Sequence, residues 1–111
     1  MKRDYKLYLN DIKESIAQIE EYLKGISLEE FNKNKQIQDA VIRRLEIIGE
    51  ASRNIPHTLK EKNKHVPWFD MSRFRDLMTH GYFEVSLKRV WKAATEEIKI
   101  IKEAIGKVKL I

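Results

Sequence analysis

The sequence predicts a single all-α domain built as an antiparallel bundle of about four or five helices, with residues 1–111 forming one unit. A chain of 111 residues ordinarily makes one core. Apolar residues make up 42% of the chain, and they recur at helical spacings along most of its length. Only four glycines and two prolines are present, which disfavours a turn-rich β architecture.

The first helix is expected to begin at Tyr5 and to end before Gly25. One face carries apolar residues at spacings of three and four, namely Tyr8, Ile12, Ile16, Ile19 and Leu23. Gly25 supplies a helix stop, and Ser27 lies three residues before Glu30 in the pattern of a capping box. A second helix is therefore predicted to begin near Ser27.

The second helical segment extends to Pro56 and is one helix or two, because the polar patch 32–35 interrupts its apolar periodicity. Gly49 lies inside this segment at a helix-propensity cost of about 1 kcal/mol, which indicates close approach of another backbone or side chain. Residues 57–66 are polar and rich in lysine. They predict a loop, with a short helical turn at 59–63.

Pro67 is well placed to open the next helix, because its fixed φ suits a first helical turn. One stripe of that helix carries Trp68, Met71, Phe74 and Met78. Gly81 is expected to end it, and Ser86 to cap a last helix. The last helix has a long apolar stripe made of Leu87, Val90, Trp91, Ala94, Ile98, Ile101, Ile105 and Val108.

Charge permits a nucleic-acid partner without specifying one. The net charge is +5, so the surface should attract polyanions through a salt-sensitive field. The absence of cysteine excludes disulfides and thiolate chemistry, and no apolar stretch suggests a signal peptide or a membrane span, so a soluble, cytoplasmic protein is expected. Kinase, polymerase and serine-hydrolase motifs are missing.

The segment 75–82 brings three reactive side chains around one predicted helix end. Arg75 is a permanent cation, His80 is a titratable imidazole and Tyr82 is a phenol. Because Gly81 should end the helix, the His80 ring can lean back toward Arg75. Imidazole can take the proton of a ribose 2′-hydroxyl, and guanidinium can stabilise the charge on the phosphate. These groups suit cleavage of RNA without a metal.

The same segment resembles the HepT branch of the HEPN superfamily, whose motif is Arg-x4-His-x-Tyr. It matches from Arg75 to Tyr82, and Asp76 is a polar residue of the kind favoured after the arginine. Residues 39–51 resemble the second helix of the family, and residues 66–68 resemble the start of its motif helix. The likeness covers nearly the whole chain.

The resemblance implies a HEPN-like fold, a homodimer and an RNA endonuclease that acts as the toxin of a toxin–antitoxin pair. Arg75 and His80 would be catalytic, in a cleft shared by two protomers, with Asp76 and Tyr82 in support and no cofactor. The implied partner is an MntA-like nucleotidyltransferase antitoxin, which would transfer AMP to Tyr82. The added charge and purine would keep RNA out of the cleft.

Simpler structural interpretations stay open for several side chains. Arg75 and His80 could form an ordinary ion-pairing or capping arrangement, Tyr82 could be a half-buried core phenol, and Asp76 could be an exposed carboxylate. Glu46 and Glu50 could hold Arg75 from below or could be solvated beside neighbouring arginines. We interpret His57 and His65 as surface residues, and Trp68 and Trp91 as core or dimer contacts.

Two other functions compete with the nuclease. HEPN relatives also serve as substrate-binding or scaffolding partners of nucleotidyltransferases without cutting RNA. A plain helical dimer that binds nucleic acid through charge alone is the third interpretation.

Overall fold

The computed structural model describes residues 3–79 and 86–111, and the described part is helical with no strand, as the sequence predicts. In chain order its elements are α1 (Tyr5–Leu23), α2 (Leu28–Lys33), α3 (Lys35–Arg53), α4 (His57–Lys62), α5 (Trp68–Ser72), the 3₁₀ turn η1 (Arg73–Arg75), α6 (Asp76–Thr79), α7 (Leu87–Lys92), the π-helical turn η3 (Ala93–Glu97) and α8 (Ile98–Gly106).

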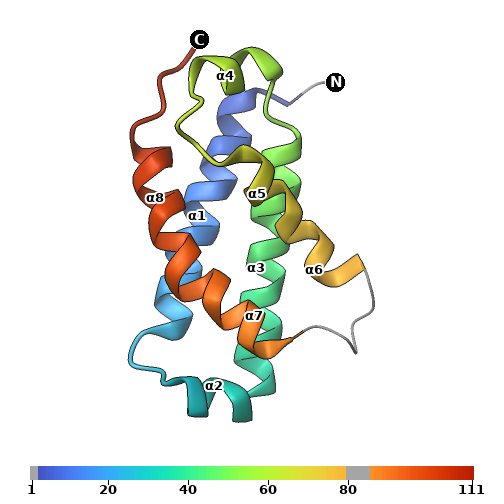
Figure 1. Cartoon of the computed structure of the whole chain (residues 1–111), viewed down its shortest axis with the longest axis vertical. Helices are drawn as coiled ribbons and strands as arrows, with labels where there is room; N and C mark the ends of the chain where they lie inside the picture. Colours follow the sequence, from blue (N-terminus) through green and yellow to red (C-terminus); the bar gives the residue numbers. More distant parts are fainter. Residues whose placement is uncertain (1–2, 80–85) are drawn as a thin grey trace.

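The long helices run up and down side by side (Figure 1). Helix α1 packs along α3, and the segment from α5 through η1 to α6 contacts α3 and crosses in front of it at an angle. The last segment, α7–η3–α8, returns upward and packs against α1. The predicted antiparallel arrangement of the main helices is confirmed. None of the helices in the described ranges has the length and apolar character needed to span a bilayer.

The helix count of four or five is too low. If directly joined pieces are counted together, residues 3–79 and 86–111 form six helices. The second segment is two helices, one of its two predicted alternatives, because Asn34 caps α3 by accepting a hydrogen bond from the Ile37 N–H at 3.0 Å. The additional helix is α4, which starts directly after Pro56, where the sequence predicts a loop with a shorter helical turn.

The predicted caps are present, and the predicted apolar stripes form the core. Ser27 and Glu30 make the expected capping box at α2, and the Ser86 hydroxyl accepts a hydrogen bond from the Arg89 N–H at α7. Tyr8 and Leu23 are only partly buried, at the two ends of the α1 stripe. The fully buried side chains come from every main helix and include Ile12, Ile19, Phe31, Val41, Leu45, Ile48, Met71, Phe74, Val90 and Ile98.

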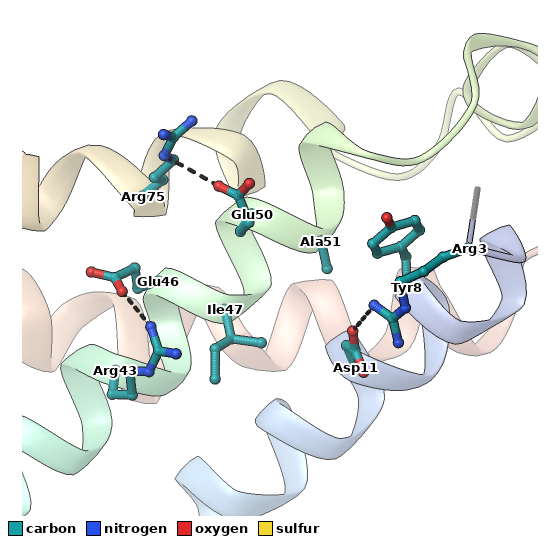
Figure 2. A pocket seen from close by; sticks show the side chains of 9 residues that line it. All are labelled: Arg3, Tyr8, Asp11, Arg43, Glu46, Ile47, Glu50, Ala51 and Arg75. Atoms are coloured by element: carbon teal, nitrogen blue, oxygen red, sulfur yellow. Dashed lines mark hydrogen bonds and ion pairs between the residues drawn. The ribbon is translucent and has the colours of Figure 1, made fainter. Parts of the chain in front are cut away.

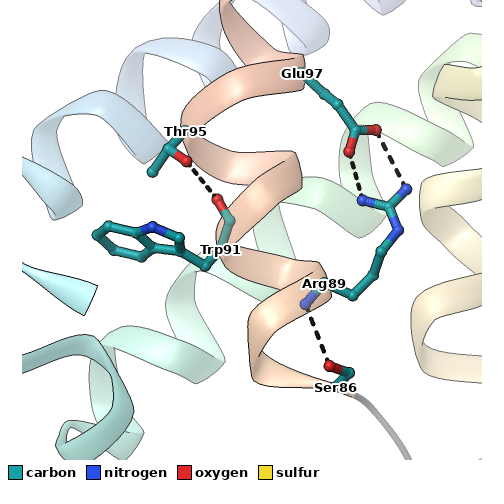
Figure 3. A network of polar contacts seen from close by, with 5 residues as sticks. All are labelled: Ser86, Arg89, Trp91, Thr95 and Glu97. Carbon is teal, nitrogen blue, oxygen red and sulfur yellow. Dashed lines mark hydrogen bonds and ion pairs between the residues drawn. The ribbon is translucent and has the colours of Figure 1, made fainter. Parts of the chain in front are cut away.

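The last helical segment departs from a regular α-helix at η3. Across this π-helical turn, Arg89 makes a two-point ion pair with Glu97, with Nη–Oε distances of 2.6 and 3.2 Å (Figure 3). The Thr95 hydroxyl donates to the Trp91 carbonyl oxygen at 2.7 Å, and the Trp91 ring lies 5.2 Å from that of Phe31. The π-turn thus joins two α-helical pieces whose apolar sides both face the core.

Candidate active site

Arg75 is the member of the predicted catalytic pair that the structure describes. It is the last residue of η1, its side chain is 43% exposed, and Asp76 follows it as an exposed residue at the start of α6. His80 and Tyr82 lie outside the described residues, so their position relative to Arg75 stays a prediction.

Gly49 sets the distance between α3 and the backbone at Arg75. A β-carbon added to Gly49 would lie 2.5 Å from the backbone nitrogen of Arg75 and 3.1 Å from its β-carbon. Real β-carbons do not approach a backbone nitrogen so closely, so only glycine allows η1 to lie against α3 in this way. The close approach predicted from a glycine inside a helix is confirmed, and its partner is Arg75.

Glu50, the neighbour of this glycine, contacts the side chain of Arg75. The Arg75 Nε lies 3.2 Å from Glu50 Oε2, and Figure 2 shows the two terminal guanidinium nitrogens on the side away from the carboxylate. An exposed pair of this kind contributes about 0–1 kcal/mol to stability. Its main effect is therefore to orient the guanidinium while its outer edge faces solvent.

Glu46 does not share this role. It pairs with Arg43 one helical turn away, with 2.6 Å between Arg43 Nη1 and Glu46 Oε1. Of the two carboxylates predicted as possible partners of Arg75, Glu50 forms the ion pair with it. Glu46 instead pairs with a neighbouring arginine of its own helix, which is the other interpretation of these glutamates.

A cavity next to Arg75 was not anticipated from the sequence. It has a volume of about 410 Å³ and lies between α1 and α3 (Figure 2). Its lining consists of Arg3, Tyr8, Asp11, Arg43, Glu46, Ile47, Glu50, Ala51 and Arg75. The one sequence signal was the cluster of charges on the outer faces of α1 and α3, which is also typical of a solvated surface.

Arg3 reaches this cavity from the residues that precede α1. Its Nη1 donates to Asp11 Oδ2 at 2.7 Å, and its guanidinium carbon lies 4.6 Å from the centre of the Tyr8 ring. The hydrogen bond with Asp11 is the main cause that raises the pKa of Arg3 above its ordinary value. The two contacts hold a side chain that would otherwise be free to move near the chain end.

The histidines and tryptophans described by the structure lie apart from this site. His57 is exposed and contacts Glu61, and His65 is exposed with its Nε2 3.1 Å from the Ala104 carbonyl oxygen, so both are surface residues as predicted. Trp68 is buried and donates its indole N–H to the Asn63 carbonyl oxygen, which confirms a core role.

Residues 12–108 match the model of a protein family described as "Ribonuclease HepT-like". The match covers most of the chain and includes Arg75, His80 and Tyr82. The chain belongs to this family. The HEPN-type resemblance carried by the motif is therefore confirmed at the level of family.

Named relatives of this HepT-like chain agree with the family. A protein of Thermococcus cleftensis named "Probable ribonuclease HepT" is 46% identical over 109 residues, which cover 98% of this chain and 99% of the relative. A Methanocaldococcus jannaschii protein named "Gamma-glutamylcyclotransferase and putative RNase" is 45% identical over 108 residues. The HepT-like chain spans about half of that relative, since the match covers 97% of the chain and 49% of the relative. No solved structure gives a significant match.

Proposed function

We propose that this HepT-like chain is a metal-independent endoribonuclease in which Arg75 and His80 carry the reaction. The observation that supports this most strongly is the setting of Arg75. Arg75 is the first residue of the family motif, and its backbone lies against Gly49 while its Nε contacts Glu50. The terminal nitrogens of its partly exposed guanidinium point away from Glu50. A preorganised, solvent-facing cation is what stabilisation of a phosphate in the transition state requires.

The reaction follows from the two groups. The neutral imidazole of His80 takes the proton of a ribose 2′-hydroxyl, the 2′-oxygen bonds to the adjacent phosphorus, and the bond from phosphorus to the 5′-oxygen breaks. Arg75 stabilises the charge on the non-bridging oxygens. The leaving 5′-oxygen takes a proton, which the protonated imidazole of a second His80 supplies when two protomers share the cleft. The products are a 2′,3′-cyclic phosphate and a 5′-hydroxyl.

The first test is cleavage of total RNA by the purified protein in excess EDTA. Because no step uses a metal ion, we expect the same rate with and without the chelator, and a faster rate at low salt, where the net charge of +5 attracts RNA more strongly. Loss of cleavage in EDTA that returns with a divalent cation would contradict the metal-independent reaction. Absence of cleavage in every buffer would favour the substrate-binding or scaffolding function.

We further propose that the protein is the toxin of a toxin–antitoxin pair and that an MntA-like nucleotidyltransferase neutralises it by modifying Tyr82. The phenol loses its proton to solvent and its oxygen bonds to the α-phosphorus of ATP. The α–β anhydride bond breaks, pyrophosphate leaves, and AMP stays attached to the tyrosine. The modification adds a negative charge and a purine two residues from His80. Both would oppose the binding of an RNA phosphate.

Tyr82→Phe should escape this modification. The variant lacks the phenol oxygen, so incubation with ATP and the antitoxin should leave its mass unchanged, while the wild-type protein gains the mass of AMP. Tyr22→Phe is the matched control, because it removes the phenol oxygen of a partly buried tyrosine of α1. This variant keeps Tyr82 and should therefore gain the mass of AMP as the wild type does. Detection of AMP on Tyr82→Phe by peptide mass spectrometry would move the acceptor to another residue.

A further inference from the structure

The cavity beside Arg75 has properties that the cleavage chemistry does not use. It lies between α1 and α3, and Arg75 and Glu50 form its edge (Figure 2). Its volume of about 410 Å³ falls within the range of small-molecule sites, about 300–1,000 Å³. A group attached to a phosphate held by Arg75 could therefore enter it.

The charged groups that line the cavity cancel each other. Three arginines face three carboxylates in the ion pairs Arg3–Asp11 at 2.7 Å, Arg43–Glu46 at 2.6 Å and Arg75–Glu50 at 3.2 Å. Cancelled charge gives little attraction for a second phosphate. It does provide hydrogen-bond donors and acceptors in fixed positions next to the apolar side chains of Ile47 and Ala51. Such a lining suits a flat, neutral ligand with a polar edge.

Arg3 supplies the flat surface. Its guanidinium carbon lies over the Tyr8 ring, 4.6 Å from the ring centre, and its Nη1 donates to Asp11 Oδ2, so two contacts hold this planar group in place. Guanidinium planes stack on nucleobases in RNA-binding proteins, and arginine and carboxylate side chains pair with the edges of bases.

We propose that this cavity is a nucleobase-binding subsite for the RNA strand whose scissile phosphate Arg75 contacts. The base stacks on Arg3, and its polar edge meets the Arg43–Glu46 pair. The inference rests on the proposed ribonuclease function, because Arg75 connects the two sites. It requires an unpaired strand, since a base within a duplex is not available to enter the cavity.

The test is the affinity of a fluorescent, single-stranded 2′-O-methyl oligoribonucleotide, which cannot be cleaved, measured by anisotropy at fixed salt. The variants are Arg3→Ala, Arg3→Lys and the control Lys102→Ala. Lys102 also forms an ion pair with α1, through Glu20 at 3.0 Å, and borders a different pocket, so its loss removes the same charge without touching the subsite. Inorganic polyphosphate serves as the competing ligand that has charge and no bases.

We expect both Arg3 variants to bind the RNA about tenfold more weakly, the effect of losing one stacked base, with Lys102→Ala near the wild type. Arg3→Lys should bind polyphosphate as the wild type does, because it keeps the charge and loses only the plane. If Arg3→Lys binds the RNA as tightly as the wild-type protein does, the base does not stack on the Arg3 guanidinium. An equal small loss in Arg3→Ala and Lys102→Ala, or no RNA binding by the wild type, would overturn the subsite.

The binding and cleavage assays distinguish a failure of the nucleobase subsite from a failure of the proposed ribonuclease function. If the wild-type protein binds the oligonucleotide through Arg3 but cuts no RNA, the subsite is supported and the ribonuclease function is contradicted. If Arg3→Ala changes neither the binding of the oligonucleotide nor the cleavage rate at low RNA concentration, the ribonuclease function is supported and the subsite is contradicted.

Discussion

Arg75→Ala should slow RNA cleavage by about 100- to 1,000-fold, the usual effect of removing one group that stabilises transition-state charge. Arg73→Ala is the matched control. Arg73 is an exposed arginine two residues earlier in η1, and its guanidinium carbon lies 6.0 Å from the ring centre of Phe69, away from the cavity beside Arg75. We expect that variant to cleave RNA within a few-fold of the wild-type rate.

The pair of variants separates catalysis from simple attraction of RNA. If the protein only binds nucleic acid through its charge, both substitutions remove one positive charge and should reduce affinity equally. Single-turnover cleavage at saturating RNA measures the difference, because affinity no longer limits the rate there. Equal rates for Arg73→Ala and Arg75→Ala under those conditions would contradict a catalytic Arg75.

Gly49→Ala should lower the free energy of unfolding by about 1–3 kcal/mol and also slow cleavage. The new methyl group would lie 2.5 Å from the Arg75 backbone nitrogen, so α3 and η1 must separate. This cost opposes a gain in helix propensity of about 1 kcal/mol from replacing glycine. The movement of η1 would also carry the Arg75 side chain away from Glu50, which explains the expected loss of activity.

Gly106→Ala is the control for this substitution. Gly106 ends α8, and a β-carbon there would meet no atom within 4 Å, so the change in stability should be small or favourable. Urea denaturation followed by circular dichroism measures both variants. A Gly49→Ala protein as stable as the wild type, with full activity, would show that the contact between α3 and η1 is not needed.

Much of the fold follows from patterns within short segments. The apolar residues of α1 and α3 recur at helical spacing, and most of them are buried because these helices face each other. Capping depends on residues three positions apart, so Ser27 and Ser86 could be identified without knowledge of the fold. The glycine at position 49 indicated a close contact because nothing in its own helix accounted for its cost.

Features that depend on tertiary placement could not be predicted in the same way. Glu46 and Glu50 are one turn apart on α3, and only the position of η1 determines which of them contacts Arg75. The cavity combines residues from the start of the chain, from α3 and from η1, and no local pattern links Arg3 to Arg75. The π-helical turn at η3 also has no signal in the apolar spacing of its segment.

The most direct test of the central claim is single-turnover cleavage of RNA in EDTA by the wild-type protein and by His80→Ala, with analysis of the product ends. We expect the wild type to leave 2′,3′-cyclic phosphate and 5′-hydroxyl ends. His80→Ala should cut at least about 100-fold more slowly, because it lacks the base for the 2′-hydroxyl, and should keep the wild-type helical spectrum. Equal rates in the two proteins, or 5′-phosphate ends from the wild type, would contradict an Arg75–His80 ribonuclease.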